Sequence, residues 1–147
     1  MIRAQCLVHR GNHILLAKHR LDGVEWWCLP GGRVEPHENP CDAALRELEE
    51  ECCVGGKIIR QTGQMIDGYG LESVTFLIDI GSQEPCLGVD PEFMGDDQIL
   101  VEVGWLTLAE IPERDRAYLW AAGLLSITEF LDEVSNWGDE LSYQNPP

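Results

Sequence analysis

The chain has 147 residues and a formal net charge of -16, from 26 acidic against 10 basic side chains. This charge repels nucleic-acid backbones and anionic lipids, because binding either depends on neutralising phosphates with Lys and Arg. We therefore expect neither free nucleic acid nor a membrane among its partners. A small phosphorylated substrate is compatible with the charge if divalent cations screen the site.

The length and a hydrophobic content of 44% suit one domain with one ordinary core, and we expect that domain to cover residues 1–147, with a frayed tail over 135–147. The six cysteines have no zinc-site spacing, and a chain of this size needs no disulfide framework. We expect reduced, mostly buried thiols and a cytoplasmic protein, since the first residues lack the apolar segment of a signal peptide.

In the first third of the chain, alternating apolar residues predict a hairpin in which 2–9 and 13–18 flank a turn. A loop over 19–24 and a short strand over 26–29 follow, and Pro30 ends that strand. Three histidines, His9, His13 and His19, recur near the hairpin without ligand spacing, and we assign them no catalytic role.

A helix is predicted from Pro40 to about Cys52, with Asn39 as its N-cap and Pro40 at the first helical position, where no N–H is needed. The pair Gly55-Gly56 is its expected terminator. The remaining elements are predicted in this order: strands over 57–67 and 71–80 around a turn at 68–70, a long loop over 81–97, a strand over 99–106, a helical turn over 108–111 and a long helix over 116–134.

The predicted helix contains four glutamates in one stretch of five residues: Glu47, Glu49, Glu50 and Glu51. Carboxylates this close raise one another's pKa unless a cation lies among them, so the segment is either a solvated surface or a metal site. At about 100° per residue, Glu47, Glu50 and Glu51 share a side of the helix, whereas Glu49 projects elsewhere. Three acids can therefore converge on one ligand.

The spacing of Gly32, Glu38 and the run 46–51 follows the pattern G-x5-E-x7-R-E-U-x-E-E-x-G-U, in which U is a bulky aliphatic residue. This resembles the Nudix box, and residues 27–31 resemble the W-x-L-P-G lead-in common in that family. One fixed position differs, because Cys53 stands where the pattern has glycine. We expect Gly55-Gly56 to supply the left-handed residue instead, with a shifted helix end and an intact site.

The resemblance to Nudix hydrolases implies an α/β fold, an α/β/α sandwich with a mixed central sheet. It also implies hydrolysis of a nucleoside diphosphate linked to another group, by water attack at phosphorus with Mg²⁺ or Mn²⁺. Glu47, Glu50 and Glu51 are the implied metal-binding acids, and the carbonyl of Gly32 is a further ligand. The implied catalytic set also includes Glu38 and Arg46, a pair that orients the loop against the helix.

The general base stays open, because members of the family differ in its position. Glu47 is the first candidate, and Glu102, Asp96 and Asp97 are the alternatives. The expected substrate is a small nucleotide such as a nucleoside triphosphate or ADP-ribose. Two other classes share the fold: a module that senses a nucleotide without turnover, and a prenyl-diphosphate isomerase, which needs a further catalytic cysteine and glutamate. The family resemblance also allows a homodimer.

Overall fold

The structure is a computed structural model that describes residues 1–90 and 99–137. In this part of the chain, one four-stranded sheet has the order β5-β1-β7-β6. Its strands are β1 (Ile2–Leu7), β5 (Gly31–Arg33), β6 (Lys57–Ile66) and β7 (Glu72–Asp79). The sheet is mixed, because β1 pairs with β7 in parallel while its other pairs are antiparallel.

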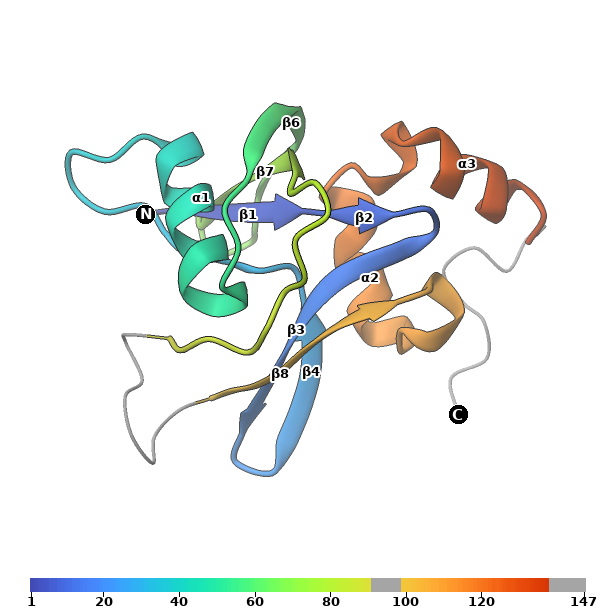
Figure 1. Ribbon diagram of the computed structural model, residues 1–147, viewed down its shortest axis with the longest axis horizontal. Helices are drawn as coiled ribbons and strands as arrows, with labels where there is room; N and C mark the ends of the chain where they lie inside the picture. The colour runs from blue at the N-terminus through green and yellow to red at the C-terminus, as the bar shows by residue number, and fades with distance from the viewer. Residues whose placement is uncertain (91–98, 138–147) are drawn as a thin grey trace.

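The second sheet of the described residues is antiparallel, with β3 pairing with β2, β4 and β8. Its strands are β2 (His9–Arg10), β3 (His13–Leu21), β4 (Val24–Cys28) and β8 (Leu100–Leu106). The helical elements are α1 (Pro40–Cys52), the 3-10 turn η2 (Leu108–Glu110), α2 (Glu113–Ala121), the 3-10 turn η3 (Leu124–Ser126) and α3 (Thr128–Ser135). Figure 1 shows α1 to one side of the strands, with α2 and α3 to the other.

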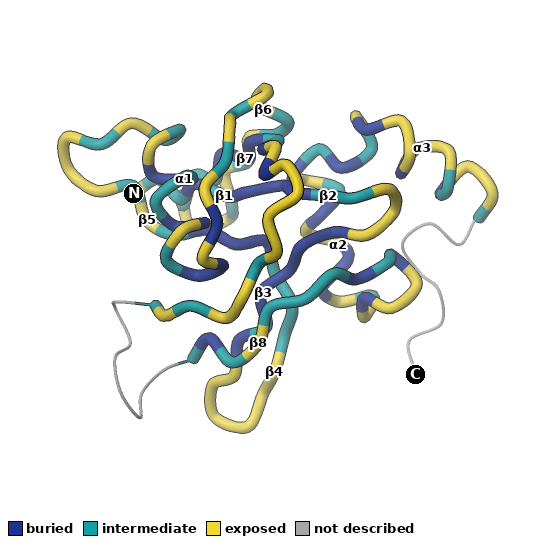
Figure 2. Tube along the Cα trace, in the orientation of Figure 1, coloured by how far each residue is buried: buried dark blue, intermediate teal, exposed yellow. Residues whose placement is uncertain are grey.

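Two apolar clusters separate the helical layers from the strands, and Figure 2 shows the buried stretches that form them along the central strands. The alternation of side chains along a strand explains the division. In β1, Cys6 contributes to the cluster under α1, and the next residue, Leu7, contributes to the cluster under α2 and α3. The predicted α/β fold with a mixed sheet and helices on both sides is confirmed.

The predicted N-terminal hairpin is wrong for most of its first arm. Only His9–Arg10 pairs with β3, whereas Ile2–Leu7 joins the other sheet. The predicted loop over 19–24 is also wrong, because β3 continues to Leu21 and pairs there with Val24. The two residues between them, Asp22 and Gly23, both have positive φ, which is the requirement of the tight turn that Asp-Gly favours.

The single helix predicted over 116–134 is wrong. The chain forms α2, then η3, then α3, and the break falls at Gly123, whose φ of 87° is left-handed. The hydroxyl of Thr62 on β6 donates to the carbonyl oxygen of Ala122 at 2.8 Å, so that contact with the sheet helps to end α2. The strands over 57–67, 71–80 and 99–106 and the helical turn at 108–111 are confirmed within a few residues.

The cysteines are less buried than the sequence predicts. Cys6 and Cys52 are buried, Cys28 and Cys41 are half-buried, and Cys53 and Cys86 are exposed. Of the predicted tail, residues 138–147 lie outside the described part, as do residues 91–98 of the predicted loop. The described residues contain no helix that is both long and apolar enough to cross a membrane.

Candidate active site

The helix α1 carries most of the candidate site, and its start agrees with the sequence prediction. The side chain of Asn39 accepts a hydrogen bond from the N–H of Asp42 at 2.9 Å, and Pro40 occupies the first turn. This cap satisfies one of the free N–H groups at the helix start. Ala43, Ala44 and Leu48 are buried against the strands, which fixes the direction of the remaining side chains.

The end of α1 corrects the prediction for Cys53. This residue adopts φ 62° and ψ 25°, the left-handed conformation, and its N–H donates to the carbonyl of Glu49 at 3.0 Å. Neither Gly55 nor Gly56 has a positive φ. The helix therefore ends at the usual position of the motif, and a cysteine takes the conformation that glycine adopts without strain, at a cost of about 1 kcal/mol.

Arg46 joins the loop before α1 to the acids on the helix. Its guanidinium donates to both oxygens of Glu38, from Nε at 2.8 Å and from Nη2 at 3.0 Å, and Nη2 also donates to the carbonyl of Arg33. Its Nη1 donates to Glu47 at 2.9 Å and to Glu50 at 3.2 Å. The structure therefore brings together the pair that the resemblance implies, and the same arginine aligns two of the three candidate acids.

Replacing Glu38 by glutamine is expected to lower the free energy of unfolding by about 1 kcal/mol at neutral pH, because a bidentate, charge-assisted pair is lost. The hydrogen bond from Arg46 holds the pKa of Glu38 below its usual value. Its contribution is therefore complete above about pH 4.3 and disappears as the pH falls through the lowered pKa. Urea unfolding of both proteins at pH 7 and at pH 3 measures the difference.

The matched control is Glu35→Gln, since the exposed Glu35 carboxylate lies 3.9 Å from the same guanidinium. It should change the free energy of unfolding by only a few tenths of a kcal/mol. If Glu38→Gln lowered the free energy of unfolding equally at both pH values, the packing of the side chain, and not its ion pair with Arg46, would account for the loss.

Glu51 and Glu47 on α1 lie against β5, the strand that contains Gly31 and Gly32. Glu51 is 1% exposed, and its Oε1 accepts the N–H of Gly31 at 2.8 Å. Glu47 is 8% exposed and lies directly against Gly32, where a Cβ would be 2.3 Å from its Oε1. Burial, and then the charge of Glu51, raise the pKa of Glu47 to about 7. Glu50 is half-buried, and burial raises its pKa as well.

These groups fit a hard cation by donor type. Carboxylates crowded in a buried position are stabilised in the ionised form by a positive charge, and oxygen donors suit Mg²⁺ and similar ions. As the side chains stand, Arg46 supplies positive charge to Glu47 and Glu50. Within residues 1–90 and 99–137, no three His, Cys, Asp or Glu side chains are arranged so that they could hold a metal ion without moving.

His19 belongs to this site, and the sequence analysis missed it. It lies on β3, is 6% exposed, and its Nε2 is 3.7 Å from Oε2 of Glu51. Its ring stacks on Trp26, and its Nδ1 is 3.2 Å from the Cys28 thiol. Burial lowers the pKa of His19, but Cys28 and Glu51 outweigh burial, so its pKa is raised. No spacing in the sequence relates residue 19 to residue 51, because strand packing against α1 creates the contact.

A cleft of about 610 Å³ opens beside these residues, and Gly32, Glu47 and His19 line one part of it. The rest of the lining is mostly aliphatic, aromatic and basic, and its aromatic and basic side chains are Trp26, Trp27, Tyr118, Arg3, Arg33 and Arg114. Asp115 of α2, which is buried, accepts the N–H of Trp27 on β4 at 2.9 Å and so joins these two elements of the cleft wall. The cleft therefore joins the acids of α1 to a wall from β4 and α2.

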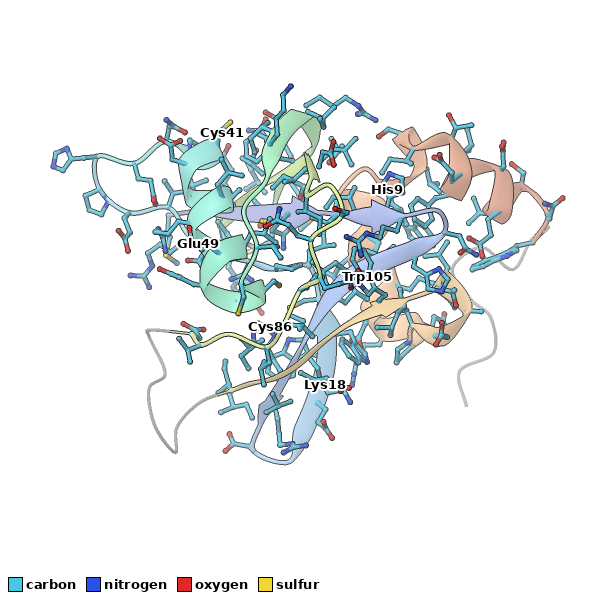
Figure 3. All side chains as sticks on the ribbon, viewed as in Figure 1. His9, Lys18, Cys41, Glu49, Cys86 and Trp105 are labelled. Atoms are coloured by element: carbon cyan, nitrogen blue, oxygen red, sulfur yellow. The ribbon has the colours of Figure 1, made fainter. Side chains whose placement is uncertain are left out.

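The other candidates lie apart from this group. Glu102 is exposed on β8 and pairs with Lys18 at 3.0 Å, and Lys18 and His19 project from opposite faces of β3. The structure therefore does not bring Glu102 to the cleft acids. Asp96 and Asp97 lie outside the described residues. Glu49 is exposed, as predicted, and Figure 3 shows its position on the outer side of α1.

Comparison with known proteins identifies the family of this chain. The family model described as NUDIX domain matches residues 1–126, and the chain belongs to this family. The family predicted from the resemblance to the Nudix box is therefore confirmed, and the match covers most of the chain.

Among curated relatives, diphosphoinositol polyphosphate phosphohydrolase 2 of Rattus norvegicus is 42% identical over 65 residues, which are 42% of this chain and 35% of that protein. Diphosphoinositol polyphosphate phosphohydrolase 3-alpha of Homo sapiens is 40% identical over 65 residues, covering 42% of this chain and 38% of that protein. The match spans only about a third of these relatives' length.

Among solved structures, a MutT NUDIX hydrolase from Burkholderia pseudomallei has a TM-score of 0.61 and 25% identity, covering 82% of this chain and 95% of that one. An ADP-ribose pyrophosphatase from Streptococcus suis has a TM-score of 0.64 and 18% identity, covering 87% of this chain and 92% of that one. The second likeness concerns the fold alone.

Proposed function

We propose that the protein is a divalent-metal-dependent pyrophosphohydrolase that cleaves a nucleoside diphosphate linked to another group. The observation that carries the proposal is the cleft, in which Gly32 and Glu47 of the Nudix box share one cavity with three arginines. Oxygen donors for a cation and guanidinium groups for phosphate thus face the same space. Its volume of about 610 Å³ lies in the range of small-molecule sites.

Glu47, Glu50 and Glu51, with the carbonyl of Gly32, would hold the metal, and Mg²⁺ or Mn²⁺ suits these donors. When bound, such an ion would neutralise charge on the phosphate oxygens and make a water molecule more acidic. Arg46 holds Glu47 and Glu50 in position through its Nη1. We keep Glu47 as the proposed base, because Glu47 lines the cleft. Glu102 is not among the residues of the cleft wall and pairs with Lys18 instead.

The cleft wall favours a nucleotide over a diphosphoinositol polyphosphate, the substrate class in the names of the curated relatives. An inositol ring that carries many phosphates needs several cations around it. Of the three arginines in the cleft, Arg114 already pairs with Asp115 at 2.9 Å and Arg3 donates to the carbonyl of Gly31 at 3.3 Å, so the cleft supplies guanidinium charge on the scale of a diphosphate and less than a ring with many phosphates needs. The aromatic faces of Trp26 and Tyr118 suit stacking on a nucleobase.

A substrate panel tests this proposal. Nucleoside triphosphates, oxidised nucleotides, ADP-ribose, sugar nucleotides, dinucleoside polyphosphates and a diphosphoinositol polyphosphate are each incubated with Mg²⁺ or Mn²⁺, and the products are identified. At least one nucleotide should be hydrolysed with a higher kcat/KM than the inositol compound. Turnover of the inositol compound alone would overturn the assignment of the substrate and leave the hydrolase assignment intact.

The alternative from the sequence analysis, a nucleotide-sensing module, predicts tight binding of a nucleotide with no turnover under any divalent metal. The two buried carboxylates of Glu47 and Glu51 argue against it, because burying them is unfavourable and a module that only binds a nucleotide does not require them. A single domain over residues 1–147, a cytoplasmic location and a homodimer stay predictions, and gel filtration with light scattering measures the last of these.

A further inference from the structure

Residues 81–90 lie along the C-terminal end of α1 and hydrogen-bond to its last carbonyl groups. The N–H of Cys86 donates to Cys52 at 3.0 Å, that of Gly88 to Glu51 at 2.8 Å, and that of Val89 to Glu50 at 2.9 Å. A helix end leaves its final carbonyls without partners inside the helix, and this segment supplies them. The contact fixes the backbone of Cys86 beside the helix end, as Figure 3 shows.

The start of the same segment is held by other side chains. Arg10 on β2 donates to Glu84 at 2.8 Å and to the carbonyls of Gly81, at 3.0 Å, and of Gln83. The side-chain amide of Gln83 donates to the carbonyls of Gly55 and Ile80, each at 2.8 Å. The segment therefore has one arrangement relative to α1, and the position of Cys86 follows from it.

Two thiols meet at this junction. Cys53 and Cys86 are both exposed, and the N–H of Cys86 donates to the carbonyl of Cys52, the residue that immediately precedes Cys53 in the chain. Cys52, the neighbour in sequence, is fully buried and points into the cluster under α1. Cys53 also occupies its left-handed position at a cost that glycine would avoid, so the residue at this position is not explained by backbone preference.

We propose that Cys53 and Cys86 are a modification site, at which a peroxide oxidant forms a reversible disulfide that joins residues 81–90 to the end of α1. The peroxide oxidises one thiol to a sulfenic acid and releases a first water molecule, and the second thiol then displaces a second water as the S–S bond forms. Two thiols thus lose two hydrogen atoms and one hydrogen peroxide becomes two waters. The disulfide would hold the segment that bears Asp90, a residue of the cleft wall, against the catalytic helix.

The test uses the full chain, reduced and then treated with hydrogen peroxide. Mass spectrometry of the digested protein should find Cys53 linked to Cys86, with a mass about 2 Da below that of the two free thiols, and a dithiol should reverse the link. Oxidation should also raise the melting temperature by several degrees, because the bond closes a loop in the unfolded chain.

Three variants make the result specific. Cys86→Ser and Cys53→Gly should form no such link and show no rise in melting temperature, and Cys53→Gly is expected to fold because glycine suits the left-handed position. Cys41→Ser, at the opposite end of α1, should behave as the wild type. Separate oxidation of the two thiols, a link from Cys86 to Cys52, or a link between two chains would each overturn the proposal. These readouts need no substrate, so they do not depend on the proposed hydrolase activity.

Discussion

Replacing Glu51 by glutamine is expected to lower kcat by about a thousandfold, equivalent to roughly 4 kcal/mol of transition-state stabilisation. The buried carboxylate supplies a negative charge beside Glu47, and a neutral glutamine amide would bind a divalent cation much more weakly. The fold should survive, because the amide oxygen can still accept the N–H of Gly31, as Oε1 of Glu51 does at 2.8 Å. Steady-state kinetics on the best substrate of the panel measures the loss.

Two further measurements separate a metal site from a structural carboxylate. Binding of Mn²⁺, followed by its electron paramagnetic resonance signal, should weaken in Glu51→Gln, while circular dichroism and the melting temperature stay close to those of the wild type. Glu49→Gln is the matched control, because Glu49 lies on the same helix and is exposed. A Glu51→Gln protein with full activity would refute the assignment of Glu51 to the metal site.

The parts of the site that the sequence predicts are those set by neighbours in the chain. Asn39 and Pro40 mark the start of α1 because capping needs only the next few residues. Helical periodicity separates Glu47 and Glu51, which are buried, from Glu49, which is exposed. The turn at Asp22-Gly23 was also readable from sequence, since Asp-Gly between apolar strands is a strong hairpin signal, and the loop prediction overlooked it.

The parts that the sequence does not predict depend on contacts between distant residues. The strand Gly31–Arg33 exists only because β1 offers it a pairing edge. His19 reaches Glu51 only through the packing of β3 beside α1. The predicted helix end at about Cys52 is confirmed, but local preference predicts the left-handed residue after it at Gly55-Gly56, whereas Cys53 adopts that conformation where residues 86–89 hydrogen-bond to the last carbonyls of α1. In each case a tertiary contact outweighs a local preference.

Replacing Gly32 by alanine is expected to lower kcat by about a hundredfold, the order of loss that a displacement of about 1 Å causes in a catalytic group. A Cβ at residue 32 would be 2.3 Å from Oε1 and 2.5 Å from Cδ of Glu47. The carboxylate must therefore move away from β5 and from its position beside Arg46. Because the clash involves the end of a flexible side chain, the variant should still fold, with a small loss in melting temperature.

Two other glycines distinguish this effect from a general intolerance of alanine. At Gly31 the added Cβ would be 2.3 Å from the backbone oxygen of Ala4, so Gly31→Ala must shift the β1 and β5 pairing and should destabilise the fold. At Gly55 no atom lies within 4 Å of the added Cβ, so Gly55→Ala should leave both activity and stability nearly unchanged. Kinetics and thermal unfolding of the three variants give different results for a misplaced carboxylate and for a disrupted sheet. A Gly32→Ala protein as active as Gly55→Ala would show that catalysis does not require Glu47 at its observed position.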